Sequence, residues 1–348
     1  MKKIILNAYF IVRLPVIFLL KIMCGFFPHP GGWQVKRILL IRLDRMGDLI
    51  LSLPVIENLQ RAYPQASIDI LIRPAMAGCA GLIPGVHPVI YDSFISAAGR
   101  LQRQHYDIVV DMLYDYPVRT AALASLTNAP VRIGFDFGFR GILFTHPVSP
   151  VQGKDMVAVN LELLKPLNIP AVVRLPSLHI CDRQAKTDGR HRVALHPGAH
   201  YPSQRWPAEK YAALAQKISA LYNAEIIVIG GPGEEDVVAE VMRGLDAAYA
   251  RAVFPGISEL VSLLCGCSLL VCNNSGPLHL AAALGVPTVS TMGPTDPVLW
   301  RSQGADQLVV RKNPGCSPCG RAVCRNHECM EEISVEEVAA CVTKIIER

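Results

Sequence analysis

Hydrophobic and polar positions alternate along the chain in blocks that predict a repeated order of strand, helix and strand. Short β-branched runs predict strands, among them KRILLIR, ASIDILIR, YDIVVDML and VRIGFD. The segments between them, such as LILSLPVIENLQRAYP and PVRTAALASL, place apolar residues at a helical period. A second series begins near RHRVALHPGA and continues through AEIIVIGG and LLVCNN. Repeats of this kind favour parallel sheets covered by helices on both faces.

The two series predict an α/β protein with two Rossmann-like doubly wound domains facing each other across a cleft. We expect the N-terminal domain over residues 35–175 and the C-terminal domain over 191–330. Residues 176–190 are largely polar and include Pro176, which is typical of a linker, and 331–348 predict a C-terminal helix. With 348 residues, 51% of them hydrophobic, the chain is long enough for two separate cores.

Residues 1–34 form an apolar segment followed by a linker. Asn7, Arg13 and Lys21 interrupt the apolar run, and Pro15 would kink a helix there. A helix over residues 4–27 would be ~36 Å long, but Arg13 near its centre would cost roughly 2.5–3.5 kcal/mol on insertion into a bilayer. We therefore expect an interfacial helix on the cytoplasmic face of the inner membrane. A terminal helix packed on the protein's own surface is the alternative, and no small-x-small signal-peptidase site follows.

Net charge and cysteine placement limit the binding partners and the cellular compartment that fit this sequence. The formal net charge is +5 without a run of five like charges, so nucleic-acid binding has no support, whereas an anionic substrate or membrane suits a mildly basic surface. Several of the eleven cysteines lie inside apolar runs such as LLCGCSLLVCNN. This placement is typical of reduced core thiols in a cytosolic protein rather than of a secreted disulfide scaffold.

Ligands of open parallel sheets bind at the carboxyl ends of the strands, so the loops at Asp48, Pro197, Gly230 and Asn273 are candidate sites. Asp48 follows a glycine in RLDRMGDLILSLP, shortly after the apolar run ILLI. A carboxylate at this position either caps the following helix or presents an acid to a ligand. Nearby Asp44 fits a loop or acceptor-side residue.

The segment VCNNSGPLHLAAALGVP predicts a buried strand, a polar turn and a helix. Backbone N–H groups at the helix start, with the Ser275 hydroxyl and close approach at Gly276, favour a diphosphate site. A simple N-cap at Asn274 or Ser275 is the alternative. Capping does not account for His279, one turn later on the same face, although such a histidine alone is more often an ordinary half-buried residue.

Three further loops carry candidate side chains. In IIVIGGPGEED a glycine pair precedes Glu234, whose carboxylate fits a ribose diol or merely the helix dipole. Arg205 in LHPGAHYPSQRWPAEKY fits a phosphate contact. Thr295 and Asp296 follow another strand in TMGPTDPVLW, where a plain turn is the alternative.

Five motifs occur in a fixed order: RLDRMGDLILSLP, LHPGA…QRWP, GGPGE, NNSGPLHLAAALGVPTVSTMGPTDP and CSPCGRAVCRNHECMEEISVEEV. In this combination the chain resembles glycosyltransferase family nine, which includes the heptosyltransferases of lipopolysaccharide core synthesis, from about Lys36 to the C-terminus. The resemblance implies a GT-B fold, an acceptor in the N-terminal domain and a nucleotide-sugar in the C-terminal domain. It also implies inverting, metal-independent transfer from an ADP-activated heptose.

Under this resemblance Asp48 is the general base, which takes the acceptor proton while the helix start at Ser275 stabilises the leaving diphosphate after domain closure. The predicted donor-binding residues are Arg205, Gly230, Gly231, Glu234, Asn274, Ser275, Gly276, His279, Thr295 and Asp296. Two positions depart from the family pattern. Asn274 stands where members commonly carry Asp, and Gln204 where they commonly carry Lys, which leaves the donor sugar open.

Four cysteines near the C-terminus fall within fourteen residues: Cys316, Cys319, Cys324 and Cys329. Their spacing alone suggests a small zinc knot. The separation between the two pairs is short for a zinc ribbon or finger, and the family resemblance accounts for the cysteines without a metal. We therefore expect no metal and no cofactor, with structural zinc as the alternative.

The sequence thus predicts an enzyme that transfers a heptose or related sugar from an ADP-activated donor to a lipopolysaccharide core or similar glycolipid. We expect a cytoplasmic protein, peripheral on the inner membrane, that acts as a monomer without nucleic acid. A non-catalytic, degenerate glycosyltransferase held at the membrane is one alternative, against which the presence of Asp48 speaks. A nucleotide-sugar epimerase on the same fold is another, and it requires a second set of acids around the sugar.

Overall fold

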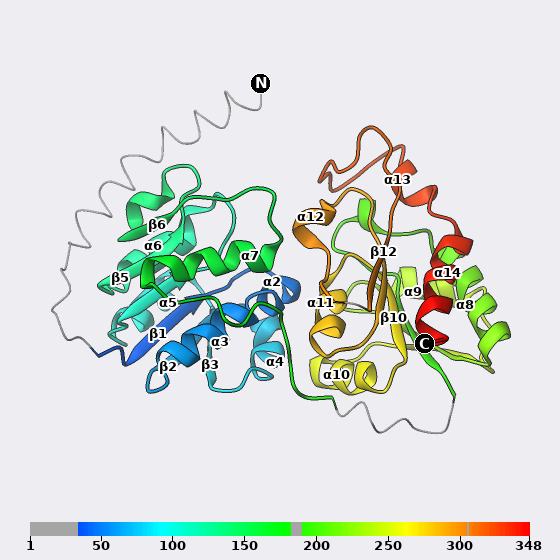
Figure 1. Cartoon of the computed structure of the whole chain (residues 1–348), viewed down its shortest axis with the longest axis horizontal. Coiled ribbons are helices and arrows are strands. Elements are labelled where there is room, and N and C mark those ends of the chain that lie inside the picture. The colour runs from blue at the N-terminus through cyan, green and yellow to red at the C-terminus, as the bar shows by residue number, and fades with distance from the viewer. Residues whose placement is uncertain (1–33, 182–189, 305) are drawn as a thin grey trace. The chain divides into compact units, whose positions relative to one another are not determined.

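The computed structural model describes residues 34–181, 190–304 and 306–348. The chain divides into two compact units, Met1–Arg174 (unit 1) and Leu175–Arg348 (unit 2), and each is a sheet with helices around it (Figure 1). The predicted membrane-associating segment lies outside the described residues, apart from Gln34. Across the described ranges, none of the helices combines the length and the apolar character needed to cross a bilayer.

Unit 1 is built on a parallel sheet of six strands in the order β3-β2-β1-β4-β5-β6. The strands are β1 (Arg37–Ile41), β2 (Ser67–Ile72), β3 (Val86–Ile90), β4 (Ile108–Asp111), β5 (Val131–Phe135) and β6 (His146–Val148). The central strands β1 and β4 are buried along almost their whole length, because helices cover both faces. The chain reverses its direction of winding between β1 and β4, which makes this the switch point where ligands of such sheets bind.

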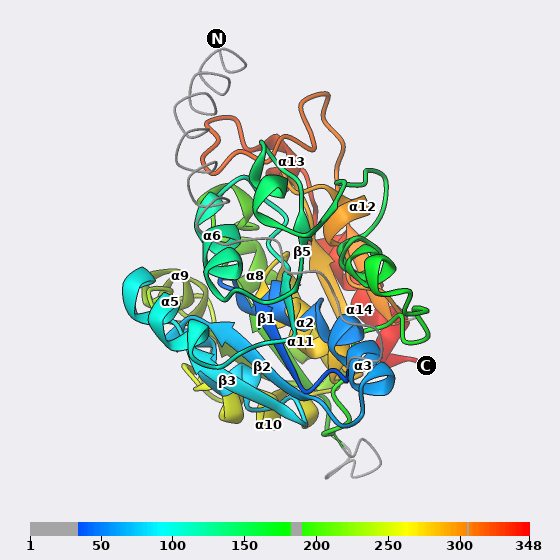
Figure 2. The ribbon, with the colours of Figure 1, turned by 90° about the vertical axis from the view of Figure 1, so that its left-hand side faces the viewer.

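Helices pack on both faces of the unit 1 sheet. They are α2 (Met46–Ile50), α3 (Leu53–Ala62), α4 (Ala77–Ala80), α5 (Phe94–Gln102), α6 (Val118–Leu126) and α7 (Met156–Leu161), with 3-10 turns at Pro74–Met76, Arg140–Leu143 and Glu162–Leu167. Buried residues of α5 and α6 share one core with β1 and β4. In Figure 2 the strands β1, β2 and β3 run between α5 on one side and α3 on the other.

Unit 2 repeats this design with a second parallel sheet, in the order β12-β11-β10-β7-β8-β9. The strands are β7 (Arg192–His196), β8 (Glu225–Ile229), β9 (Ala250–Val253), β10 (Leu269–Asn273), β11 (Thr288–Thr291) and β12 (Gln307–Val310). Counted within each unit, the two sheets have the same strand order, so the switch point of unit 2 lies between β7 and β10. The predicted α/β class with two doubly wound sheets is confirmed.

Helices also surround the sheet of unit 2. They are α8 (Ala208–Tyr222), α9 (Glu235–Met242), α10 (Ile257–Cys265), α11 (Gly276–Ala283), α12 (Pro297–Trp300), α13 (Glu328–Glu331) and α14 (Val335–Ile346), with a 3-10 turn at Pro202–Gln204. One large cluster of buried residues lies between α8, α9, α14 and the strands. Trp206 is fully buried in this core, and its indole N–H donates to the Ile333 carbonyl at 3.0 Å. Side chains of α8 and α14 pack in the same cluster, so the C-terminal helix is part of the core of unit 2.

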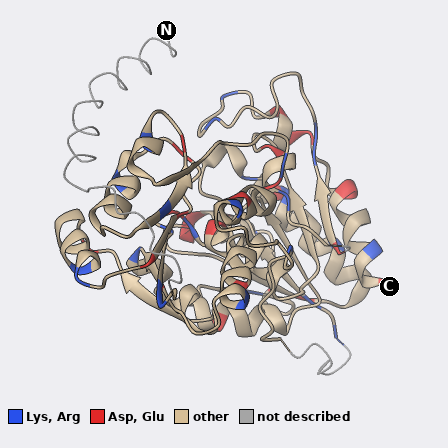
Figure 3. Ribbon diagram, turned by 60° about the vertical axis from the view of Figure 1, so that its left-hand side comes forward, with Lys and Arg blue, Asp and Glu red and all other residues tan. Residues whose placement is uncertain are grey.

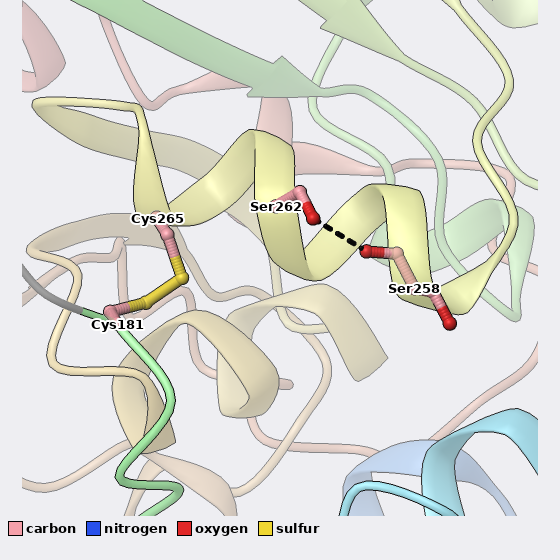
Figure 4. Close-up of a disulfide and its surroundings, with 4 residues drawn as sticks. All are labelled: Cys181, Ser258, Ser262 and Cys265. Atoms are coloured by element: carbon pink, nitrogen blue, oxygen red, sulfur yellow. Dashed lines mark hydrogen bonds between the residues drawn. A yellow bond between two sulfur atoms is a disulfide. The ribbon is translucent and has the colours of Figure 1, made fainter.

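A disulfide joins Cys181 to Cys265 (Figure 4). Cys181 ends the described segment that precedes residue 182, and Cys265 is the last residue of α10, with the two Cα atoms 5.3 Å apart. The Leu178 amide donates to the Ala283 carbonyl at 2.7 Å, which holds this segment beside α11. The expectation that the cysteines of the LLCGCSLLVCNN run are reduced thiols is therefore wrong for Cys265. Its partner lies 84 residues away in sequence, where a local pattern carries no information about it.

Candidate functional site

Asp48 lies in the short helix α2, which begins five residues after β1 ends. The apolar period predicts one continuous helix over this region, but the structure has α2 and α3 as separate helices. Pro54 is the second residue of α3, and it has no N–H to donate to the Ile50 carbonyl one turn earlier. The break leaves Asp48 on a single turn at the carboxyl end of β1, next to the switch point of unit 1.

The Arg42 guanidinium fixes the loop that carries Asp48. Its side chain is almost completely buried, and its Nε donates to the Asp48 carbonyl at 3.1 Å and to Ser52 Oγ at 2.9 Å. The terminal nitrogens donate to the Met112 carbonyl beyond β4 and to Asn160 Oδ1 of α7 at 3.4 Å. One buried cation therefore ties α2 to the end of β4 and to α7. Sequence reasoning missed this role of Arg42, because the residue ends an apolar strand.

Only one of the two oxygens of the Asp48 carboxylate makes a hydrogen bond within the described residues. Its Oδ2 accepts a hydrogen bond from the Arg45 amide at 3.3 Å, as a helix-capping carboxylate does, whereas its Oδ1 has no hydrogen-bond partner among the described residues. Both sequence interpretations thus describe the same side chain, since one oxygen caps α2 and the other stays available to a ligand.

Asp44 is a second carboxylate beside Asp48. Its Oδ2 accepts from Arg42 Nη1 at 3.2 Å, but its Oδ1 is buried without a partner in the described parts of the chain. Burial raises the pKa of Asp44, the Asp48 charge raises it further, and Arg42 opposes both. The loop and helix that follow β1 therefore present two unequal acids close together.

In unit 2 three side chains form a continuous hydrogen-bonded chain across the switch point. His196 is the last residue of β7, and its Nε2 lies 3.0 Å from Glu234 Oε2. Its Nδ1 lies 3.2 Å from Oγ of Ser275, which follows β10. His196 is 4% exposed, so this contact is shielded from water. Glu234 and Ser275 were predicted site residues, and His196 was missed.

The positions of the protons in the Glu234–His196–Ser275 hydrogen bonds follow from which groups accept them. A carboxylate only accepts hydrogen bonds, so His196 Nε2 carries the proton that faces Glu234. If Nδ1 is also protonated, it donates to Ser275 Oγ and leaves the hydroxyl proton of Ser275 free for a ligand. If Nδ1 is unprotonated, it accepts the Ser275 hydroxyl proton instead. The protonation of His196 therefore decides whether Ser275 is a donor toward the helix start.

The Glu234 carboxylate is closely surrounded by hydrogen-bond donors and backbone. Burial raises its pKa, but the His196 bond, the Gly231 amide at 2.7 Å and the nearby Arg205 charge outweigh burial and hold the pKa below its usual value. A Cβ on Gly198 would lie 2.0 Å from Glu234 Oε1, so the β7 loop approaches the carboxylate too closely for any side chain. Gly230 is likewise closed in, because a Cβ there would lie 2.5 Å from the Phe254 ring.

Asn273 connects the loops around this chain. Its side chain is fully buried, and its Nδ2 donates to the Pro197 and Gly198 carbonyls at 2.8 and 3.1 Å. Its Oδ1 accepts from the Trp206 amide and the Thr291 hydroxyl, both at 2.9 Å. All four hydrogen-bonding positions of the amide are used, so Asn273 fixes the ends of β7, β10 and β11 together. Sequence reasoning singled out its neighbour Asn274, which is half-buried.

The start of α11 keeps only part of its predicted donors. Ser275 occupies the N-cap position, but its Oγ is turned to His196 rather than to the helix amides. Pro277 removes one further N–H from the first turn. The Gly276 amide and the Ser275 hydroxyl thus remain the groups that can meet an anion at this helix start.

His279 is buried one turn into α11. Its Nδ1 lies 3.3 Å from Ser302 Oγ, and burial lowers its pKa from 6.5 to about 4. The ring is therefore neutral at pH 7, and it acts as a hydrogen-bonding group rather than as a cation. Arg205 supplies the positive charge instead, with its Nη2 3.4 Å from the Ala199 carbonyl and its Nε buried without a partner in the described residues.

The two predicted residues of the loop after β11 have different partners. Thr295 Oγ1 accepts from Gln204 Nε2 at 3.0 Å, so this loop is joined to the segment that carries Arg205. Asp296 is exposed and caps α12 by accepting from the Val298 amide at 2.8 Å.

The cysteine-bearing loop packs against the loops that follow β7 and β11. The Ser203 hydroxyl donates to the Arg321 carbonyl at 2.5 Å, and the Ser317 hydroxyl donates to the Gly293 carbonyl at 2.7 Å. Burial raises the pKa of Cys329 to about 11, and the neighbouring thiols Cys319, Cys316 and Cys324 contribute to this rise. The described ranges contain no group of three or more His, Cys, Asp or Glu side chains arranged to hold a metal ion.

A family model and several sequence relatives match the chain. The family described as Glycosyltransferase family 9 (heptosyltransferase) matches residues 95–330, beyond Asp48 in the sequence. Lipopolysaccharide heptosyltransferase 3 of Escherichia coli is 27% identical over 73% of this chain and 83% of its own length. Lipooligosaccharide heptosyltransferase 2 of Haemophilus ducreyi is 26% identical over 79% of this chain and 88% of its own length.

Solved structures share the fold. ADP-heptose lps heptosyltransferase II of E. coli superposes with a TM-score of 0.77 at 21% identity, over 90% of this chain and 99% of its own. E. coli heptosyltransferase WaaC with ADP gives a TM-score of 0.73 at 22% identity, over 89% of this chain and all of its own. The same enzyme is also known with ADP-2-deoxy-2-fluoro heptose. These likenesses confirm the predicted GT-B fold.

Proposed function

The chain belongs to glycosyltransferase family 9, the heptosyltransferase family, and from this we propose that it moves a heptose or related sugar from an ADP-activated donor to a lipopolysaccharide core or similar glycolipid. One observation carries the proposal, namely the hydrogen-bonded chain of Ser275, His196 and Glu234 at the switch point of unit 2. It supplies a hydroxyl, a helix start and a carboxylate where nucleotides bind in doubly wound sheets. The ADP in the structural relative supports the same leaving group here.

Asp48 acts as the general base. A sugar hydroxyl is a poor nucleophile, so a carboxylate oxygen must accept its proton while the oxygen forms a bond to the anomeric carbon. The unengaged Oδ1 of Asp48 is available for this, and the Arg42 network holds the backbone beneath it. The bond from the anomeric carbon to the diphosphate breaks as the new bond forms on the opposite face, which inverts the configuration. The products are the glycosylated acceptor and ADP.

The donor site is expected to neutralise the departing diphosphate with groups of unit 2. The Gly276 amide and the Ser275 hydroxyl face the phosphate oxygens, and Arg205 adds a fixed positive charge. The Glu234 carboxylate is positioned for the ribose diol next to the Gly231 amide. In this proposal hydrogen-bond donors and the Arg205 charge stabilise the leaving group, and transfer proceeds without a divalent ion. Thr295 and Asp296 stay predicted donor contacts on the loop after β11.

The Asp48→Asn variant tests the base assignment. The amide keeps the size of the side chain but accepts no proton, so we expect transfer from ADP-heptose to fall at least about 100-fold, as for loss of a general base. Donor binding, measured by calorimetry with ADP-heptose, should stay roughly unchanged, since the donor groups lie in unit 2. Asp115→Asn, at an exposed carboxylate of unit 1, is the matched control and should retain full turnover. Unchanged turnover in Asp48→Asn would refute the assignment.

Asn274 and Gln204 leave the sugar of the donor open. A neutral amide replaces an acid near the sugar, and Gln204 is committed to Thr295 rather than to a phosphate. Thermal-shift measurements with a panel of nucleotide-sugars that includes ADP-heptose would identify the donor, because a ligand that binds only the folded state raises the melting temperature.

We propose that residues 1–27 hold the enzyme on the cytoplasmic face of the inner membrane, where a glycolipid acceptor is presented. The apolar run interrupted by Arg13 and Lys21 is typical of an interfacial helix, and the net charge of +5 favours an anionic surface. Basic residues are spread over the described ribbon rather than gathered in one band (Figure 3). Deletion of residues 1–27 is expected to move the protein from the membrane pellet to the soluble fraction, and an unchanged distribution would contradict the anchor.

A further inference from the structure

Unit 1 holds a cavity of about 470 Å³ between α5 and the neighbouring strands. Its polar lining consists of Arg37, Asp69, Arg100, Arg103, Gln104 and Tyr106. Arg37 is the first residue of β1, and Tyr106 lies two residues before β4, so the cavity extends to the amino ends of these strands. Asp48 follows the opposite end of β1. The cavity is therefore separate from the candidate acceptor site, and the proposed reaction does not use it. Figure 2 shows α5 beside the β2–β3 edge of this sheet.

The floor of the cavity is a fixed polar frame. Asp69 is 6% exposed, and its Oδ2 accepts from the Tyr106 hydroxyl at 2.7 Å and from Arg37 Nη2 at 3.0 Å. Burial and the Asp69 contact raise the pKa of Tyr106, so its hydroxyl keeps the proton that it donates. Arg37 also donates to Gln104 Oε1 at 2.6 Å and lies over the Tyr106 ring, 5.3 Å from its centre. Arg37 is thus held in place before any ligand arrives.

Arg100 and Arg103 of the α5 region bring unused donors to this cavity. Arg100 Nη2 donates to the Ile90 carbonyl at 2.6 Å and to Asp92 at 2.9 Å, while its Nε is buried without a partner in the described residues. Arg103 Nε donates to the Gly99 carbonyl at 2.9 Å. The terminal nitrogens of Arg103 make no hydrogen bond within the part of the chain that the structure describes. Arg103 is exposed, so water satisfies these nitrogens in the absence of a ligand, whereas the buried Arg100 Nε has no acceptor within the described residues. A buried N–H without an acceptor is unfavourable, which points to a ligand that supplies one to Arg100.

The charges of the lining define the class of that ligand. Three guanidinium groups line the cavity, but Asp69 pairs with Arg37 and Asp92 pairs with Arg100, so the excess is one positive charge, that of Arg103. A phosphate monoester carries about −1.5 to −2 at neutral pH and offers three acceptor oxygens, which suits planar guanidinium donors better than a carboxylate does. The volume exceeds that of a phosphate alone, and Val89 and Leu101 add an apolar part to the wall.

We propose that this cavity binds the phosphate of an organic phosphomonoester. Arg100 and Arg103 donate hydrogen bonds to the phosphate, and Arg37 is a third cation that is already held in place. The shared chemistry admits two sources, a soluble phosphorylated metabolite and the headgroup of a membrane lipid. Ile95 of α5 is 85% exposed, so the same helix that leads into the cavity also presents an apolar side chain to its surroundings.

The test uses the full-length protein with saturating ADP, so that the donor site does not contribute phosphate binding. Calorimetry measures glycerol 3-phosphate, and flotation measures phosphatidylcholine vesicles that contain phosphatidic acid. Vesicles with phosphatidylglycerol at equal surface charge carry a phosphodiester and control for general attraction to a negative surface. We expect the Arg100→Gln/Arg103→Gln double variant to bind the relevant probe at least about tenfold more weakly than the native chain. Arg243→Gln, on the surface of unit 2, is the matched control.

Two results support the proposal and identify the source. Weakened binding of glycerol 3-phosphate alone identifies a soluble metabolite. Weakened binding of phosphatidic acid vesicles, reduced again by Ile95→Ser, identifies a lipid headgroup. Equal affinity of the double variant and the native chain for both probes overturns the proposal, as does equal loss on phosphatidic acid and phosphatidylglycerol. If the double variant unfolds, Arg103→Gln serves alone, because its side chain makes only one local hydrogen bond among the described residues.

Discussion

His196 shows how a single side chain joins two parts of the donor site. It lies between the Glu234 carboxylate and the Ser275 hydroxyl, and both contacts are within hydrogen-bond distance. Glu234 and Ser275 each hydrogen-bond to the imidazole and not to each other in these contacts. A change in the position or charge of one therefore reaches the other through the His196 ring. A ring at this point aligns the Glu234 carboxylate with the Ser275 hydroxyl.

Replacement of His196 by glutamine is expected to lower kcat/KM for the donor by about 10–100-fold, because a charge-assisted hydrogen bond contributes about 1.5–3 kcal/mol. Loss of the imidazole contact also removes one of the causes that hold the Glu234 pKa down, so that pKa should rise. As the solution is acidified, donor affinity should therefore begin to fall at a higher pH in the variant than in the native enzyme. Calorimetric titration with ADP across the acidic to neutral pH range measures this.

The control for that experiment is His191→Gln, at a half-buried histidine that contacts Ser268 away from the site. Superimposable pH profiles of the His196 variant and the native enzyme would contradict the role given to His196.

At the residue scale the sequence singled out candidate side chains at or near helix starts and passed over buried ones at or beside strand ends. Asp48, Glu234 and Ser275 stay predicted site residues, chosen because each follows an apolar run with glycine nearby. Arg42 directly follows β1 and His196 ends β7, where a polar residue looks like a strand boundary rather than a functional group. Their contacts include Asn160, 118 residues from Arg42, and Glu234, 38 residues from His196, which no local pattern encodes.

Among the elements, the C-terminal helix α14 begins with a complete cap. Ser334 Oγ accepts from the Glu337 amide at 3.2 Å, and Glu337 Oε2 accepts from the Ser334 amide at 2.9 Å. Lys312 Nζ donates to the other Glu337 oxygen at 2.6 Å, which joins α14 to the chain that follows β12. The cap fixes where a helix of the unit 2 core starts.

The Glu337→Gln variant should lower the stability of unit 2 at pH 7 by about 0.5 kcal/mol, a modest amount because the carboxylate is partly exposed. The Lys312 bond and the Ser334 cap hold the pKa of Glu337 at about 2, below its usual 4.5. A depressed carboxyl pKa contributes stability above the unfolded-state pKa and loses it as pH falls toward the folded-state pKa. The difference between variant and native chain should therefore shrink as the pH falls from 4.5 to about 2, measured by urea unfolding.

Glu336→Gln is the matched control, since this neighbour is more exposed and only reaches Lys217 at 3.7 Å. A pH-independent difference for Glu337→Gln would show that the ionised carboxylate is not what stabilises the cap.

The central strands of both sheets were predicted, whereas the edge strands were not. β1, β2, β4, β5, β7, β8, β10 and β11 coincide with the apolar runs that predicted them. β3 and β6 each contain a proline, Pro88 and Pro147, and β9 has two exposed residues among its four. An edge strand has only one neighbour and needs fewer apolar side chains and amides, so its sequence lacks the signal of a buried strand.

Across the whole molecule, the disulfide is the one covalent link between distant segments that the described residues contain. It closes a loop with a sequence separation of 84, from the first residues of unit 2 to the end of α10. In the chain-entropy account a loop of that length stabilises the folded state by about 4.5 kcal/mol. The remaining cysteines of the described residues are free thiols.

A count of thiols tests this link. Nine of the eleven cysteines are expected to react with a thiol reagent in protein denatured without reductant, and all eleven after reduction. The double variant Cys181→Ser/Cys265→Ser should show nine in both cases, and its unit 2 should unfold at lower urea. Eleven reactive thiols before reduction would contradict the pairing, and a peptide map that joins Cys181 to another cysteine would contradict its assignment.

The shared strand order of the two sheets also has a consequence for synthesis on the ribosome. Every strand pairing joins two segments of the same unit, so unit 1 has all its partners once residue 174 has emerged. The 174 residues of unit 2 then take about 9–35 s to translate at ~5–20 residues per second. Unit 1 therefore has every pairing partner of its sheet throughout this interval, and a ribosome that stalls within unit 2 releases a chain that carries the complete unit 1.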